Sequence, residues 1–230
     1  MVVPAALSSW RSLALLAVLL IGGGATFIYS RDKPAESTRR PDAARLMNDL
    51  MSGKAQVGGP FTLEDQFGKR RSLADFRGKP VLLYFGYTFC PDVCPTDLAA
   101  MAQAIRTLDA AGKVLQPIFI TLDPERDTHE ILRNYAAAFH PRFVALRGSE
   151  EEVRRVATAY KIYFEKVRPP GSSVYLIDHM AFVFLLDRDG RYVAFFPPGT
   201  TAERMAVMVG EALAQRGLAA PPPPRALRLT

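Results

Sequence analysis

The chain has 230 residues, of which 49% are hydrophobic and 23% are charged, and this composition excludes a disordered chain, a collagen and a multi-span membrane protein. The net charge of +6 lies mostly at the two ends, because residues 46–217 carry 21 Lys and Arg against 20 Asp and Glu. A nearly neutral body has no overall attraction for phosphate, so we expect no nucleic-acid partner. Two cysteines are too few for the disulfide framework of a small secreted domain.

An uncharged stretch of 19 residues at 12–30 predicts a single N-terminal transmembrane helix after a short segment at 1–11. As a helix it would be roughly 28 Å long, close to the thickness of the hydrocarbon core of a bilayer. Trp10 and Tyr29 lie at its ends, where aromatic rings favour the headgroup level. A cleaved signal peptide is the alternative, but no clear cleavage site follows the apolar run.

Two polar segments flank the predicted folded body at 50–217. Residues 31–49 contain Pro34 and Pro41 and indicate a tether, and residues 218–230 contain four consecutive prolines and indicate an extended tail. Basic residues are more numerous after the predicted anchor than before it. By the positive-inside rule, they favour a body in the cytoplasm.

Alternating strand and helix patterns fill the body. Hydrophobic periodicity, turn residues and capping pairs predict the following elements: a hairpin at 61–66 and 70–73, a strand at 81–87, a helix at 95–111, a strand at 118–122, a helix at 127–139, a strand at 144–146, a helix after Ser149 to 160, an edge strand at 162–167, a hairpin at 181–186 and 192–196, and a helix capped by Thr200 that ends near 216.

This order predicts an α/β fold. Strands that alternate with helices pair in parallel through crossover helices, and the two hairpins add antiparallel strands. We therefore expect a mixed sheet flanked by helices, with an N-terminal hairpin. The strand at 81–87 ends where the cysteine-containing loop begins, at the edge of the sheet where sites usually lie.

The two cysteines lie close together, at Cys90 and Cys94, directly after that buried strand. Pro95 suits the first position of a helix, which predicts Cys94 as its N-cap, where the helix dipole favours a thiolate. Two thiolates are soft donors that suit Cu(I) or zinc, and they could also form a disulfide. Dithiol oxidoreductases usually have two residues between their cysteines, whereas this chain has three.

The histidines and one acidic segment have structural interpretations when taken alone. A histidine before a strand, such as His179, is more often a satisfied structural residue, and His129 and His140 fall at the predicted ends of a helix. The segment 123–128 contains Asp, Pro and Thr in an order typical of a helix start.

Three segments taken together resemble the Sco (SenC/PrrC) family over roughly residues 50–215. They are GYTFCPDVCPTDL, TLDPERDT and YLIDHMAFVFLLDRDG, in this order. The resemblance implies a thioredoxin-like fold and a copper-binding protein that assists assembly of the dinuclear copper centre of cytochrome c oxidase.

The family's metal ligands correspond to Cys90, Cys94 and His179, with Asp178 and Asp123 in supporting positions. Copper is expected as Cu(I), with Cu(II) as the alternative state. The family often has a small hydroxyl residue after the histidine, whereas this chain has Met180. A thioether there could bind copper, but strand alternation favours its pointing to the opposite face.

The resemblance leaves a copper metallochaperone and a membrane-tethered thiol–disulfide reductase as alternatives, and related folds also carry out peroxide chemistry. The partners it implies are the copper-bearing subunit of cytochrome c oxidase, other copper chaperones and, through the anchor, a membrane. It implies a bacterial inner (cytoplasmic) membrane with the soluble domain on the periplasmic side. That placement conflicts with the charge bias around the anchor.

Overall fold

The computed structural model describes residues 48–50, 56–108 and 115–215. The chain divides into two compact units between Ala55 and Gln56, and the second unit is the α/β domain discussed below. The predicted anchor at 12–30, most of the tether and the tail at 218–230 lie outside the described residues. Within the described ranges, no helix is both long enough and apolar enough to cross a bilayer.

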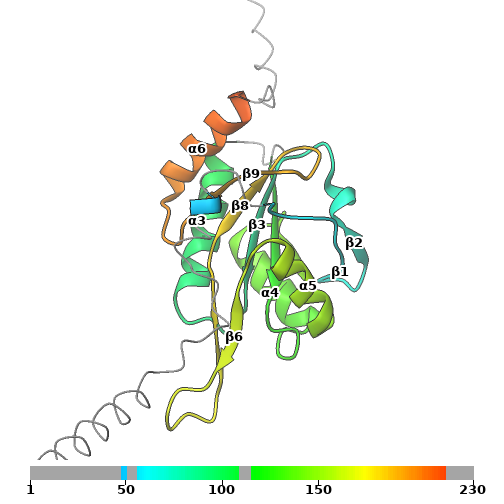
Figure 1. Ribbon diagram of the computed structural model, residues 1–230, viewed down its shortest axis with the longest axis vertical. Helices are drawn as coiled ribbons and strands as arrows, with labels where there is room; N and C mark the ends of the chain where they lie inside the picture. The colour runs from blue at the N-terminus through cyan, green and yellow to red at the C-terminus, as the bar shows by residue number, and fades with distance from the viewer. Residues whose placement is uncertain (1–47, 51–55, 109–114, 216–230) are drawn as a thin grey trace, which may run out of the picture. The chain divides into compact units, whose positions relative to one another are not determined.

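A seven-stranded mixed sheet forms the centre of the domain (Figure 1). Its strand order is β2-β1-β5-β4-β3-β8-β9, with β3, β4 and β5 parallel to one another and the outer pairs antiparallel. Both predicted hairpins are therefore confirmed as the edges of a mixed sheet. The strands are β1 (Thr62–Asp65), β2 (Arg70–Ser72), β3 (Val81–Gly86), β4 (Gln116–Thr121), β5 (Val144–Arg147), β8 (Val183–Leu186) and β9 (Tyr192–Phe196).

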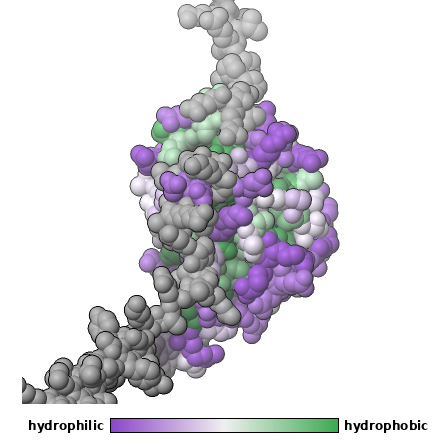
Figure 2. Space-filling model, viewed as in Figure 1, coloured by the Kyte–Doolittle hydropathy of each residue, from purple (hydrophilic) through white to green (hydrophobic). Residues whose placement is uncertain are grey.

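Helices cover both faces of this sheet (Figure 1). Every residue of β3 and β4 is buried, as expected of parallel strands that are covered on both sides. On the face shown in Figure 2, hydrophilic side chains dominate the described surface. The helices are η1 (Leu73–Phe76), α3 (Val93–Leu108), α4 (His129–Phe139), α5 (Glu150–Ala159) and α6 (Ala202–Gln215).

The helix starts agree with the sequence in part. The capping box of Ser149 and Glu152 at α5 is confirmed, with both reciprocal hydrogen bonds present. At α6 the predicted cap is wrong by one residue, because Arg204 N–H bonds to the Thr201 hydroxyl while the Thr200 hydroxyl donates to Pro197 O. Adjacent threonines offer equivalent side chains, and only the backbone path decides which one reaches the helix.

The predicted edge strand at 162–167 belongs to a different sheet. It forms β6 (Phe164–Val167), which pairs only with β7 (Leu176–His179) in an antiparallel two-stranded sheet. The sequence does not predict β7, because four residues are too short for a clear alternation pattern. The β6–β7 hairpin has no ladder hydrogen bonds to the main sheet within the described residues, and residues 180–182 join β7 directly to β8 of that sheet.

Parallel pairing brings two loops to one edge of the main sheet. β3 and β4 are in register from Val81 opposite Gln116 to Gly86 opposite Thr121, so their carboxyl ends lie side by side. Leu122 N–H continues this pairing with a 2.7 Å hydrogen bond to Gly86 O. The cysteine loop after β3 therefore begins next to the acidic segment after β4, as the sequence predicts for a site at this edge.

The close packing at Gly86 generates a testable prediction. A Cβ atom there would lie 2.9 Å from both Cys94 Sγ and Tyr84 Cε1. We expect Gly86→Ala to lower the free energy of unfolding by about 1–3 kcal/mol, as overpacking typically does in a well-packed core. Urea denaturation of the reduced protein measures this change.

Gly210→Ala in α6 is the matched control. Its nearest neighbour would be Leu108 Cδ2 at 3.9 Å, an ordinary contact. Alanine is the better helix former, so this variant should be unchanged or more stable by about 0.5–1 kcal/mol. An unchanged stability of Gly86→Ala would contradict the packing described at the start of the cysteine loop.

Candidate metal centre

The cysteine loop connects β3 to the first turn of α3. Thr96 N–H bonds to Asp92 O, so the hydrogen bonding of α3 begins at Asp92 and the helix itself begins at Val93. The prediction that Cys94 is the N-cap is therefore wrong, because Cys94 lies inside the first turn. Pro95 follows it at a position whose N–H would have no partner within the helix, so proline is tolerated there.

Three side chains converge where this helix begins. Cys90 Sγ, Cys94 Sγ and a ring nitrogen of His179 all lie within 4.8 Å of one another. The distance from Cys94 Sγ to His179 Nε2 is 3.4 Å, and Cys94 N–H donates to Cys90 Sγ at 3.4 Å. Cys94 is fully buried, whereas Cys90 is half-buried and lies nearer the surface.

The two thiols differ strongly in acidity. A hydrogen bond from the Cys94 thiol lowers the pKa of Cys90 to about 4, with further contributions from His179 and from backbone N–H groups, while burial opposes this shift. The hydrogen bond to Cys90 and burial raise the pKa of Cys94. Cys90 is therefore the thiolate of the metal-free pair, and Cys94 retains its proton.

Aromatic rings form the walls around the imidazole. His179 meets the rings of Tyr84 and Tyr87 edge-on, at centroid distances of 6.5 and 5.9 Å. Phe89, directly before Cys90, is 54% exposed. The site is thus closed toward the core and open on the side of Cys90.

Asp97 is a residue of this neighbourhood that the sequence analysis missed. It lies one turn after Cys94 on α3, is buried, and accepts a 2.9 Å hydrogen bond from Gly199 N–H. Burial raises the pKa of its carboxyl, and the Tyr84 hydroxyl interacts with both this carboxyl and the Cys94 thiol. An acid three residues after a motif cysteine shares its helix face, and this spacing was the signal available in the sequence.

The predicted supporting acids lie outside the cluster of Cys90, Cys94 and His179. Asp178 is exposed and pairs in register with Glu165, and because strand side chains alternate, it points away from the face of His179. Asp123 is fully buried and binds the Tyr175 hydroxyl at 2.9 Å and the Arg126 guanidinium. Neither carboxylate therefore lies among the three donor atoms of the cluster.

The remaining candidates have structural partners. Met180 N–H donates to Tyr163 O, next to the last residue of β7. His129 Nε2 lies 3.2 Å from the Glu64 carboxylate, and His140 Nδ1 accepts a hydrogen bond from Arg142 N–H just after the end of α4. The interpretation of His140 as a helix-terminal side chain is confirmed, and His129 proves to connect α4 to β1.

The donor set has a definite chemical preference. Two cysteine sulfurs and one imidazole nitrogen are the ligands that Cu(I) accepts in low coordination numbers, whereas structural zinc requires a fourth ligand. Within the described part of the chain, no fourth His, Cys, Asp or Glu belongs to the cluster. The fold and the site together define a thioredoxin-like domain with a thiolate–imidazole metal centre.

Comparison with known proteins places this domain in a family. Residues 50–214 match the SCO1/SenC family, and the chain belongs to it. It is 36% identical over 190 residues to the mitochondrial SCO1 homologue of Homo sapiens, and this match covers 82% of the present chain and 61% of the human protein. The chain thus spans less than two thirds of the length of the human relative.

Solved structures of relatives have the same fold. The structure of Arabidopsis thaliana ScoI with copper bound is 36% identical, with a TM-score of 0.66, and the match covers 69% of this chain and 99% of that one. The structure of Bradyrhizobium japonicum ScoI with copper bound is 41% identical, with a TM-score of 0.62 and coverage of 68% and 99%.

The acidity of Cys90 predicts its reactivity. In the reduced, metal-free protein, Cys90 should react with iodoacetamide as fast at pH 6 as at pH 8, because its thiolate persists until the pH approaches about 4. Cys94 should stay unmodified, since it is buried and protonated. Peptide mass spectrometry at a series of pH values measures both rates.

The Cys94→Ala variant is the control for this prediction. It removes the thiol that donates to Cys90, so the pKa of Cys90 should rise and its alkylation should depend on pH between 6 and 8. If Cys90 of the unaltered protein already reacts roughly tenfold faster per pH unit over that range, its thiol is ordinary and the described pairing is wrong.

Proposed function

We propose that this protein is a copper metallochaperone that binds copper through Cys90, Cys94 and His179 and assists assembly of the dinuclear copper centre of cytochrome c oxidase. The observation that carries the proposal is the convergence of these three donors within 4.8 Å in a chain of the SCO1/SenC family. Copper is bound in solved structures of two similar proteins, which supports copper over zinc as the cargo.

The geometry suits a metal that is passed on rather than kept. Two of the donors are fixed from the interior, since Cys94 is fully buried and His179 is bordered by tyrosine rings. Cys90 lies in the loop and is half-buried. A three-coordinate centre with one accessible side leaves room for an incoming ligand of a partner, so that copper can be exchanged without release into solvent.

The proposed setting is a membrane. We place the anchor at 12–30, the tether at 31–49, the copper-binding domain at 50–217 and the tail at 218–230. The domain then faces the periplasm from a bacterial inner membrane, where it meets the copper-bearing subunit of the oxidase and other copper chaperones. Labelling of Cys90 by a membrane-impermeant maleimide in intact cells tests this placement, and labelling only after lysis would contradict it.

An anaerobic Cu(I) titration of the reduced protein tests the metal site. We expect about one Cu(I) per chain, and His179→Ala should weaken binding by more than about 100-fold, because loss of a direct ligand exceeds the 10- to 100-fold effect of outer partners. Competition with a chromophoric Cu(I) chelator measures the affinity. His140→Ala is the matched control, since it removes an imidazole at the C-cap of α4 that accepts a hydrogen bond from Arg142 N–H and lies outside the donor cluster.

Thiol–disulfide reduction of the oxidase cysteines is the second candidate function, favoured by the low pKa of Cys90. It requires Cys90 and Cys94 but not His179. If the reduced protein binds no Cu(I), while both it and His179→Ala reduce an oxidised peptide from the copper site of the partner at equal rates, the reductase is the correct assignment.

A further inference from the structure

The ligands of the proposed copper site come from two parts of the fold that no ladder of backbone hydrogen bonds connects. Cys90 and Cys94 follow β3 of the main sheet, whereas His179 ends β7 of the separate hairpin. The segment 121–127, which we call the bracket, lies after β4 and contacts both parts. Thr121, Asp123 and Asp127 in it are all fully buried.

The bracket has two sets of contacts, which we call its arms. The first arm connects it to the cysteine loop through Asp127. Its carboxylate accepts hydrogen bonds from Thr88 N–H at 3.1 Å and from the Thr88 hydroxyl at 2.6 Å, two residues before Cys90. It also accepts a 2.5 Å hydrogen bond from the Thr121 hydroxyl at the end of β4. Asp127 therefore connects the loop that carries Cys90 to the main sheet by charge-assisted hydrogen bonds.

The other arm reaches the hairpin through Arg126. Its guanidinium pairs with Asp123, donates a 3.0 Å hydrogen bond to Tyr175 O and stacks over the Tyr175 ring at 3.8 Å. The Tyr175 hydroxyl in turn donates to Asp123 at 2.9 Å. Tyr175 directly precedes β7, so this arm holds the strand that ends in His179.

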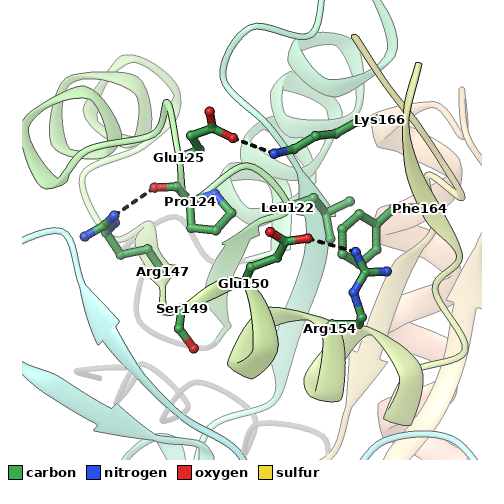
Figure 3. A pocket seen from close by; sticks show the side chains of 10 residues that line it. Leu122, Pro124, Glu125, Arg147, Ser149, Glu150, Arg154, Phe164 and Lys166 are labelled. Carbon is green, nitrogen blue, oxygen red and sulfur yellow. Dashed lines mark hydrogen bonds and ion pairs between the residues drawn. The ribbon is translucent and has the colours of Figure 1, made fainter. Parts of the chain in front are cut away.

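Residues of β5 and β6 also hold the bracket in place. Arg147 on β5 donates to Pro124 O at 2.8 Å and to Asp127 O at 3.1 Å, and Lys166 on β6 forms an ion pair with Glu125. Pro124, Glu125, Arg147 and Lys166 line a pocket between α5 and the hairpin (Figure 3). The bracket is therefore held by β5 and β6 as well as by its contacts with the cysteine loop and the hairpin. Because of these contacts, the position of the main sheet determines the position of the hairpin.

We propose that Asp127 and Arg126 are positioning residues that set the separation between the thiols and the imidazole, Asp127 through the cysteine loop and Arg126 through both that loop and the hairpin that ends in His179. This inference rests on the proposed copper site. Metal ligands lose affinity when the groups that orient them are removed, typically by 10- to 100-fold. Arg126 also lies over the rings of Phe89 and Tyr87, at 4.9 and 5.9 Å, so it contacts the cysteine loop as well as the hairpin. The Tyr175 hydroxyl and Asp127 each act on one of the two elements, so their effects are separable by double-mutant cycles.

The test compares Cu(I) affinities of the full chain with and without His179. Arg126→Gln should lose about tenfold in affinity, and this loss should become smaller but persist in the His179→Ala background, because only one of the two elements it contacts then lacks its ligand. Asp127→Asn should lose about tenfold in both backgrounds, because it acts through Cys90. Arg155→Gln, which removes an exposed guanidinium paired with Glu151, is the charge-matched control and should change nothing.

Gentler variants guard against a failure to fold. Tyr175→Phe removes only the hydroxyl that donates to Asp123, and Thr88→Val replaces only the hydroxyl that donates to Asp127 by a methyl group. The affinity loss of Tyr175→Phe should vanish in the His179→Ala background, and that of Thr88→Val should persist in both backgrounds. Thr107→Val, whose hydroxyl donates to Gln103 O in the exposed part of α3, is the control for the threonine variant.

Amide hydrogen exchange of the metal-free protein gives a second readout. Asp127→Asn should speed exchange at residues 87–94 by about tenfold or more, and Tyr175→Phe should do so at residues 164–179, each leaving the other segment unchanged. Equal affinity losses for Tyr175→Phe in both backgrounds, or exchange that rises in both segments or in neither for these two variants, would overturn the inference. Absence of Cu(I) binding by the unaltered protein would instead reject the proposed function, while the exchange pattern would still test the two arms.

Discussion

The parallel pairing of β3 with β4 is the constraint on which the site depends. It places the end of β3, where the cysteine loop begins, next to the end of β4, where the segment 121–127 begins. The backbone of Leu122 extends the pairing to Gly86 O, so the two loops start from a common rigid edge. Every side-chain contact between them, including that of Asp127 with Thr88, starts from this register.

The two thiols differ in burial, and this difference gives them different acidities. Cys94 projects into the interior, where Gly86 leaves space for its sulfur and no other residue type would. Cys90 remains in the loop and collects hydrogen bonds from Cys94, which lowers its pKa. The difference in burial thus makes Cys94 a buried, protonated thiol and Cys90 an accessible thiolate. In the proposed site, Cys94 would hold a soft metal from the interior and Cys90 would present it at the surface.

Local signals predicted most of the fold, because they depend on near neighbours in the chain. The capping box of Ser149 and Glu152, the all-buried strands β3 and β4, and the hairpin of β8 and β9 each have a pattern that one segment contains. The errors fall where equivalent residues compete or where pairing is distant. Thr200 and Thr201 are indistinguishable as caps in sequence, and β7 is a strand only because β6 pairs with it.

The candidate donors could likewise be chosen from the sequence, because CPDVC and the later histidine belong to three ordered motifs. What the sequence by itself determined is therefore the donor types, the family and the alternation of strands and helices, since these reside in residue identity and short-range spacing. Only the tertiary structure decided that Cys94 lies inside its helix and that Asp97 is part of the site. It also decided that Asp123 and Asp127 hold separate elements, while Thr128 caps α4 as the sequence predicts. Those roles depend on contacts between residues far apart in the chain, and side-chain depth and partners exist only once the sheet has brought them together.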